Sequence, residues 1–177
     1  VTTVPAEDGT LGVFIAGGQR LVLGQYAQEL QVTSDPLDGS RAAIGIVESN
    51  GVRALAPEMM AGGSMAGLLK FQNDDLVDAR NLLGQMAASI SARVNDQQAL
   101  GLDLRTPAGK GAAMFEVGAP EASPASSNAK NAAGRYIASV AVSVTDASLL
   151  QASDYELRAD PSNPGTYTVT RLSDGLV

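Results

Sequence analysis

The stretch that most constrains the fold is a proline-free run from Ser64 to Gln98, which predicts one unbroken helix. Gly62 and Gly63 precede it, the Ser64 hydroxyl is placed where it is expected to cap the first turn, and Gly101 follows its end. Apolar side chains form one stripe along it, made of Leu69, Leu76, Leu83 and Ile90 with Met65, Ala79 and Met86 beside them. A helix of this length measures roughly 50 Å. Its apolar stripe must be buried against other elements, and we expect the four residues spaced seven apart to be buried.

The composition excludes most catalytic chemistry. The 177 residues include no cysteine, histidine or tryptophan, so Ser/His/Asp triads, thiolate nucleophiles and thiolate zinc sites are excluded. The formal net charge of -7 is spread along the chain, which argues against nucleic acid as a partner. No apolar run is long enough to cross a membrane. We therefore expect no enzymatic activity, no cofactor, no metal, no nucleic acid and no membrane span.

Two β-hairpins are predicted before the helix. Leu11–Ala16 and Arg20–Leu23 flank Gly17-Gly18-Gln19, and Ala42–Glu48 and Val52–Ala56 flank Ser49-Asn50-Gly51. Asn-Gly is a strong hairpin signal because both residues tolerate the conformations of a tight turn. A weaker strand is expected within Gln25–Thr33. A small antiparallel sheet should therefore cover part of the helix stripe.

The chain after the helix divides into a linker and a second β module. Residues 101–104 and 113–117 suggest a further hairpin or an extended excursion, and residues 118–133 are rich in Ala, Ser, Pro and Asn, as in a linker. Alternating or β-rich runs follow at residues 136–144, 153–158 and 166–171. The prediction is an α+β fold: a rod-like helix-plus-hairpin domain over 1–117, a linker over 118–133, and a truncated antiparallel β domain over 134–177. The start at Val1 without a leader indicates a piece of a longer chain.

Four local patterns could carry chemistry, and each has a plainer interpretation. Asp74 and Asp78 are a carboxylate pair one helical turn apart, but acidic residues early in a helix favour its positive end. Gly109-Lys110 lacks the rest of a phosphate loop, and Ser127-x-x-Lys130 lacks the companions of an acyl-serine enzyme. Asp35 and Asp38 lack the ligand spacing of a calcium loop, so a turn is expected there.

Several segments together resemble one known family. The helix opening Gly62-Gly63-Ser64-Met65-Ala66-Gly67, the run Ala87–Asn95 followed by Gly101-Leu102-Asp103-Leu104 and Met114-Phe115, the hairpin Gly12–Gly24, and the late segments 145–157 and 168–175 are similar to the flagellar hook-associated protein 1 family. The resemblance covers most of the chain, and the segments occur in the family's order and spacing.

The resemblance implies a non-enzymatic subunit of the bacterial flagellum that joins hook to filament. It implies export to the cell exterior and self-assembly into a ring through lateral contacts. The implied partners are copies of the subunit, the hook protein, the next hook-associated protein, and an export chaperone bound through terminal segments absent here. Charged groups on the polar helix face are the candidate subunit contacts: Asp74, Asp75, Asp78, Arg80 and Arg93.

Two other classes of protein remain open on the residues alone. Flagellin-like and hook-like structural subunits share a long helix with hairpins. A secreted glycan-binding or hydrolytic module could use Asp74, Asp78 and the sparse tyrosines. Binding to a glycan array would favour the second class.

Overall fold

The protein is described by a computed structural model that covers residues 1–5, 7, 9–15, 18–60 and 62–177. It is an α+β fold, which confirms the predicted class. In chain order the elements are β1 (Thr2–Pro5), β2 (Leu11–Phe14), β3 (Arg20–Leu23), β4 (Tyr26–Ala27), β5 (Leu30–Ser34), β6 (Ala42–Glu48), β7 (Gly51–Ala54), η2 (Pro57–Met59), α1 (Gly63–Lys70), η3 (Phe71–Asp75), α2 (Leu76–Ala99), η4 (Ala147–Leu149), β8 (Tyr155–Ala159) and β9 (Tyr167–Arg171).

The chain forms two compact units. The first consists of Val1–Asn73 and Ala122–Val140, and the second of Asp74–Glu121 and Ala141–Val177. The predicted division at residues 117 and 134 stays a prediction, which limited proteolysis can test.

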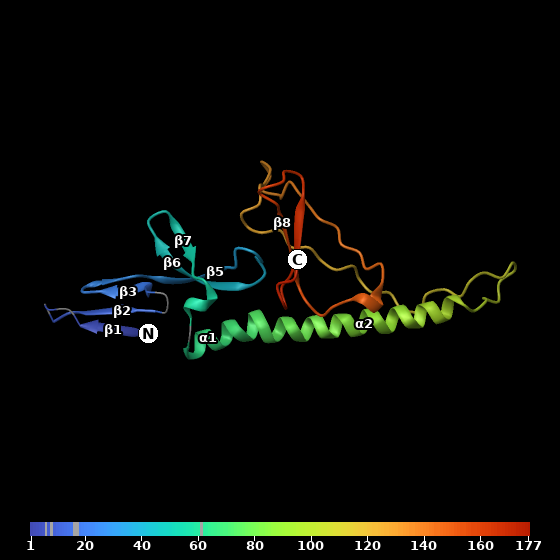
Figure 1. Cartoon of the computed structure of the whole chain (residues 1–177), viewed down its shortest axis with the longest axis horizontal. Coiled ribbons are helices and arrows are strands. Elements are labelled where there is room, and N and C mark those ends of the chain that lie inside the picture. Colours follow the sequence, from blue (N-terminus) through green and yellow to red (C-terminus); the bar gives the residue numbers. More distant parts are fainter. Residues whose placement is uncertain (6, 8, 16–17, 61) are drawn as a thin grey trace. The chain divides into compact units, whose positions relative to one another are not determined.

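The first unit contains two antiparallel sheets, of order β1-β2-β3-β4 and β5-β6-β7 (Figure 1). Both predicted hairpins are present: Val13 pairs with Val22, and Glu48 pairs with Gly51 around the Ser49-Asn50 turn. Gly18 has a φ of 75°, which a glycine adopts without strain. Ala16 and Gly17 of the predicted first hairpin lie outside the described residues.

The core of the first unit lies on β6 and the segment after β7. Ile46 is 1% exposed and packs in a cluster with Ile44 and Leu55. Half-buried apolar side chains from the β2–β3 turn, from η2 and the residue after it, and from α1 pack against this cluster: Ile15, Met59, Met60 and Leu69. The sheet therefore covers the first part of the helix stripe, as expected.

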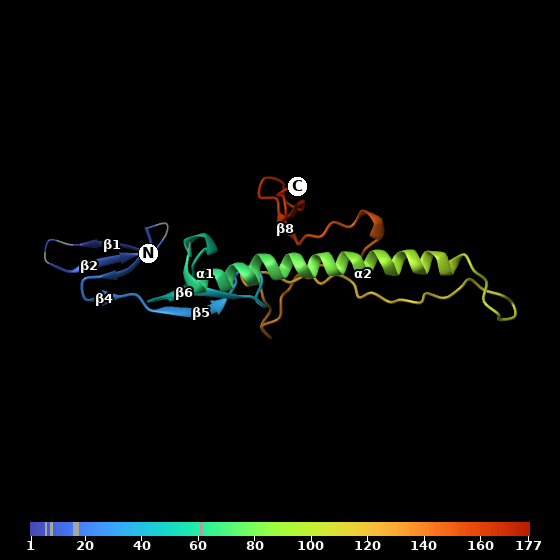
Figure 2. The same cartoon turned by 90° about the horizontal axis from the view of Figure 1, so that it is seen from below.

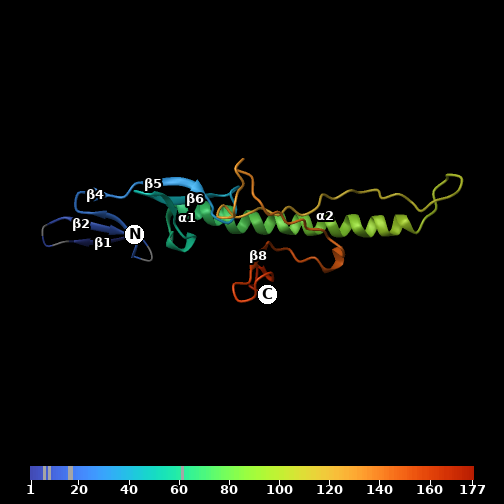
Figure 3. The same cartoon turned by 90° about the horizontal axis from the view of Figure 1, so that it is seen from above.

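The second unit is organised around α2. The chain after α2 turns back through a loop closed by the Leu102–Lys110 bridge and runs beside the helix, and η4 and the β8–β9 hairpin also belong to this unit (Figures 2 and 3). The β8–β9 hairpin confirms the last two predicted strands. No strand of the described chain runs through 113–117 or 136–144, so the strand predicted at 136–144 is wrong, and of the two alternatives for 113–117 the extended excursion fits and the hairpin does not. Residues 136–144 have apolar alternation, but a strand also needs a partner strand beside it.

The predicted helix is present between Gly63 and Ala99, but it is not an unbroken α-helix. A π-helical turn, η3, separates α1 from α2. A π turn takes about one residue more than an α turn, so it rotates the following side chains by about 100° relative to an uninterrupted helix. Leu69, before η3, and Leu76, after it, therefore do not continue one straight stripe.

Candidate assembly surface

Side chains on one side of α2 bind the rest of the second unit through hydrogen bonds. Asn81 Nδ2 donates to Asp154 Oδ1 at 3.1 Å, Gln85 Nε2 to the Leu150 carbonyl at 2.6 Å, and Ser89 Oγ to the Ala147 carbonyl at 3.3 Å. These helix residues are four apart, and we call them the polar row. A spacing of four places them along one side of the helix, where all three are half-buried.

Asn95 holds the segment that runs back beside α2. Its Oδ1 accepts from the backbone N–H groups of Met114, at 2.8 Å, and Phe115, at 3.1 Å, while its Nδ2 donates to the Phe115 carbonyl at 2.8 Å. One carboxamide thus makes three hydrogen bonds to main-chain groups. A groove lies along this part of the second unit, between α2, residues 115–120 and residues 143–148.

The apolar row of α2, which we define as Leu76, Ala79, Leu83, Met86 and Ile90, lies on another side of the helix. At 100° per residue, the centre of the polar row lies about 140° from the centre of the apolar row in one sense around the helix. Asn95 lies about 140° from the centre of the apolar row in the other sense. The prediction that Leu83 and Ile90 are buried is therefore wrong: Leu83 is 66% exposed and Ile90 56% exposed, while Leu76 is half-buried. The second unit covers the polar side of α2 and leaves most of the apolar row open.

The five charged candidate residues are all exposed, but the helix does not gather them into one patch. Asp78 and Arg80 lie about 160° apart around α2. Asp74 and Asp75 lie in the π turn, and Arg93 lies near the far end of α2. Across the described residues they offer separate contact points along the helix and no joint charge cluster.

The other sequence candidates have structural partners. Asp35 Oδ1 accepts from the backbone N–H groups of Leu37 and Asp38, as the predicted turn requires. The Lys130 ammonium lies 4.5 Å from the centre of the Tyr136 ring, a cation–π contact. Within the described ranges, no group of three potential metal ligands comes together, and none of the helices combines the length and the hydropathy of a membrane span.

Carboxylates in the loops are tuned by local hydrogen bonds. The backbone N–H of Gly109 and the Arg105 side chain lower the pKa of Asp103, and Ser148 lowers the pKa of Asp146. Ionised carboxylates are better acceptors, so these bonds favour the charged form. They close turns at the surface, which is the expected role of Asp in loops.

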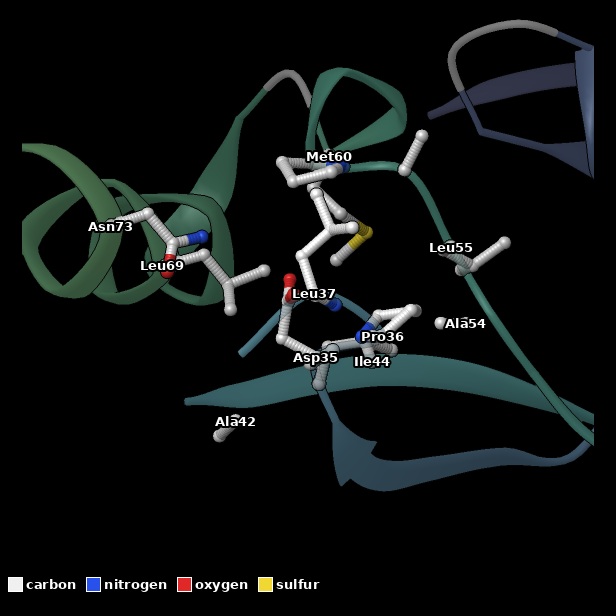
Figure 4. A pocket seen from close by; sticks show the side chains of 13 residues that line it. Asp35, Pro36, Leu37, Ala42, Ile44, Ala54, Leu55, Met60, Leu69 and Asn73 are labelled. Atoms are coloured by element: carbon white, nitrogen blue, oxygen red, sulfur yellow. Dashed lines mark hydrogen bonds between the residues drawn. The ribbon is translucent and has the colours of Figure 1, made fainter. Parts of the chain in front are cut away.

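A small apolar pocket lies between the sheet and α1 in the first unit (Figure 4). It measures about 280 Å³, and its walls include Ile44 and Leu55 from the sheet side and Leu69 and Asn73 from the helix side. Its lining continues the core cluster and holds no arrangement of catalytic groups.

Sequence reasoning did not single out Asn81, Gln85, Ser89 and Asn95. A signal was present, because three of them recur four residues apart on the side of the helix away from the apolar stripe. The pattern identifies a polar face, but only the fold shows that this face is bonded to the chain's own backbone.

Comparison with known proteins identifies the family. A sequence model described as the flagellar hook-associated protein FlgK helical domain matches residues 1–115, and one described as the flagellar hook-associated protein 1 D2-like domain matches residues 126–176. Flagellar hook-associated protein 1 of Escherichia coli K12 is 31% identical over 168 residues, covering 94% of this chain and 29% of that protein. The corresponding protein of Salmonella typhimurium is 31% identical over 169 residues, covering 95% of this chain and 29% of that protein.

A solved structure agrees with the sequence matches. The flagellar hook junction protein FlgK from Burkholderia pseudomallei superposes with a TM-score of 0.81 at 32% identity, over 98% of this chain and 30% of that chain. The chain thus spans less than a third of the length of these relatives. The family match extends over both units, and on this evidence the chain belongs to the flagellar hook-associated protein 1 family.

Proposed function

We propose that this chain is part of a structural subunit of the bacterial flagellum that joins hook to filament outside the cell. The observation that carries the proposal is the apolar row of α2, which is open in a chain of this family. Covering the exposed parts of Leu83, Met86 and Ile90 would contribute about 1 to 2 kcal/mol each before entropy is counted. A face of this kind suits a protein whose helices pack with other helices.

We infer that terminal helical segments of the full-length subunit cover the apolar row, and that charged residues outside the row make lateral contacts between copies in a ring. The candidates are those predicted from sequence: Asp74, Asp75, Asp78, Arg80 and Arg93. Exposed ion pairs are weak singly, about 0 to 1 kcal/mol, but many add up in a ring whose subunits are held in register. The hook protein and the next hook-associated protein are the proposed neighbours, and an export chaperone is the proposed partner before assembly. We propose no catalytic activity and no cofactor.

Electron microscopy tests the assignment directly. Antibody raised against the 177-residue chain should label flagella of the source organism at the boundary between hook and filament. Labelling along the filament or along the hook would instead indicate a flagellin-like or hook-like subunit. Specific binding to a glycan array without flagellar labelling would indicate the secreted glycan-binding class.

Charge reversal tests the lateral contacts. Full-length protein carrying Asp78→Arg and Arg80→Asp keeps its net charge and should fold and be exported, yet join hook to filament poorly. Because the net charge is unchanged, a defect would show that the positions of these two charges matter for joining hook to filament. Normal motility in that strain would remove these two residues from the contact set.

A further inference from the structure

The edge of β6 is completed by a side chain from the helix. Gln72, in the π turn, donates from Nε2 to the Ala42 carbonyl at 3.0 Å and accepts at Oε1 from the Ala42 N–H at 3.3 Å. Both main-chain groups of Ala42 are therefore bonded to one carboxamide. This is the pattern by which a residue on a neighbouring antiparallel strand would pair with Ala42.

The register of the sheet shows which strand residue is missing. β6 and β7 pair Gly45 with Ala54, and the Leu55 N–H donates to the Ile44 carbonyl at 2.7 Å. This bond places Ile44 opposite Leu55, so two residues further along each strand Ala42 would face Pro57. Proline has no N–H to donate, and here the chain leaves the sheet and enters η2. Among the described residues, Ala42 therefore has no strand partner on this side.

The side chain that substitutes for the missing strand residue comes from the π turn. Gln72 and its neighbour Asn73 are both half-buried, and Gln72 Nε2 also donates to Asn73 Oδ1 at 3.0 Å, which orients the carboxamide. Asn73 lies at the edge of the pocket between helix and sheet (Figure 4). Gln72 and Asn73 lie three and four residues after Leu69, which packs against the core cluster of the sheet, so one side of the helix brings all three to β6.

We propose that Gln72 takes the place of a strand residue at position 57 and guards the open edge of β6 against pairing with a strand of a second copy. Open strand edges readily accept further strands, and proteins block them with local devices. Ala42 is exposed, so its edge would be accessible without the carboxamide. The guard goes beyond the proposed flagellar role, since it protects the single chain from a wrong association.

Hydrogen exchange of the Ala42 amide tests directly whether Gln72 protects this edge. Gln72→Leu removes both bonds while keeping the side-chain size similar, and it should speed exchange of the Ala42 amide by at least about tenfold. Gln72→Glu keeps an acceptor and should protect that amide better than Gln72→Leu does. The Ala43 amide is the internal reference, because its main chain faces β5, where it pairs with Thr33.

The matched control is Gln97→Leu, the same change at an exposed residue of α2 for which no side-chain hydrogen bond is present within the described residues. Gln72→Leu should sediment with more self-association than Gln97→Leu at equal concentration. Adding Ala42→Pro to Gln72→Leu should reverse the gain, because proline blunts an edge strand by removing its N–H. The apolar row of α2 is unchanged in all three variants, so association through that row is common to them.

Four results would overturn the proposal. They are an Ala42 exchange rate unchanged by Gln72→Leu, an equal rise at Ala43, no gain of association over Gln97→Leu, and a gain that Ala42→Pro does not reverse. An equal rise at Ala43 would mean that Gln72 stabilises the whole sheet and does not guard its edge.

Discussion

Asp38 closes the turn between β5 and β6 through both hydrogen bonds and charge. Its Oδ1 accepts from the Ser40 N–H and hydroxyl, and its Oδ2 lies 2.9 Å from Arg41 Nε. The Ser40 hydroxyl, then the Ser40 backbone N–H, and then Arg41 lower the pKa of Asp38 from the ordinary value of 3.8. A carboxyl group with a lowered pKa in the folded state stabilises that state above its ordinary pKa, and this stabilisation is lost as the pH falls through the lowered value.

Asp38→Asn should lower the free energy of unfolding by about 0.5 kcal/mol at neutral pH, the usual value for a solvent-accessible ion pair. The asparagine can still accept a hydrogen bond from Ser40, so the loss of free energy of unfolding measures the contribution of the carboxylate charge. Urea unfolding from about pH 6 to about pH 2 should show the difference from wild type shrinking as the wild-type carboxyl protonates. Asp96→Asn, at an exposed helix position, controls for net charge. A difference that persists at the acid end would contradict this assignment.

Leu83 and Ile46 have similar size and opposite environments. Since Leu83 is 66% exposed, Leu83→Asp should change the free energy of unfolding of this chain by no more than about 0.5 kcal/mol. Ile46 is 1% exposed, and Ile46→Ala should cost about 2 to 5 kcal/mol through the cavity it leaves. Chemical denaturation of both variants checks the pair. A loss of several kcal/mol in Leu83→Asp would restore the original expectation that the apolar row is buried within this chain.

Hydrogen bonds from three residues of α2, each one helical turn after the last, attach the helix to residues 147–154. Gln85→Ala removes the 2.6 Å bond to the Leu150 carbonyl and leaves that half-buried carbonyl without this donor. The expected loss is about 1 kcal/mol, with faster proteolysis between residues 147 and 154. Gln97→Ala is the matched control on the same helix. Equal stability and equal cleavage rates in the two variants would show that the polar row does not hold this segment.

The sequence predicted the elements better than their surroundings. The helix was placed within one residue at each end, because glycines flank it and no proline interrupts it. The exposure of Leu83 could not be predicted, since an amphipathic pattern shows that a face needs cover but not which chain supplies it. The π turn leaves no simple periodic signal. Residues 136–144 alternate like a strand, yet strand formation depends on a partner distant in sequence.

The candidate surface was predictable only in part. The five charged residues were expected on an exposed helix face, and their exposure agrees, but the π turn and the 100° step per residue distribute them around the helix. Gln72 could not be identified, because its role depends on the β6–β7 register and on Pro57 lacking an N–H. Such contacts join residues about 30 positions apart, beyond the reach of local patterns.

At the scale of the whole molecule, the predicted division at 118–133 can be tested by limited proteolysis. Glu121 is exposed in a stretch without regular structure, whereas Ser126, further along, donates from its N–H and hydroxyl to the Pro36 carbonyl. A glutamate-specific protease should therefore cut first after Glu121 and leave an N-terminal fragment close to the predicted 117-residue domain. Mass spectrometry identifies the cut. First cleavage at Glu116 or Glu156 would argue against the predicted linker.

The polar attachment of α2 has a consequence for thermodynamics. The apolar residues that are buried within the described chain, Ala43, Ile44, Ile46 and Leu55, all belong to the first unit, while α2 is bound to its unit by carboxamides and a hydroxyl. Exposing apolar surface raises the heat capacity of unfolding and exposing polar surface lowers it. Opening of the second unit should therefore carry the smaller heat-capacity change. Its stability should vary almost linearly with temperature, while the first unit should lose stability on cooling as well as on heating.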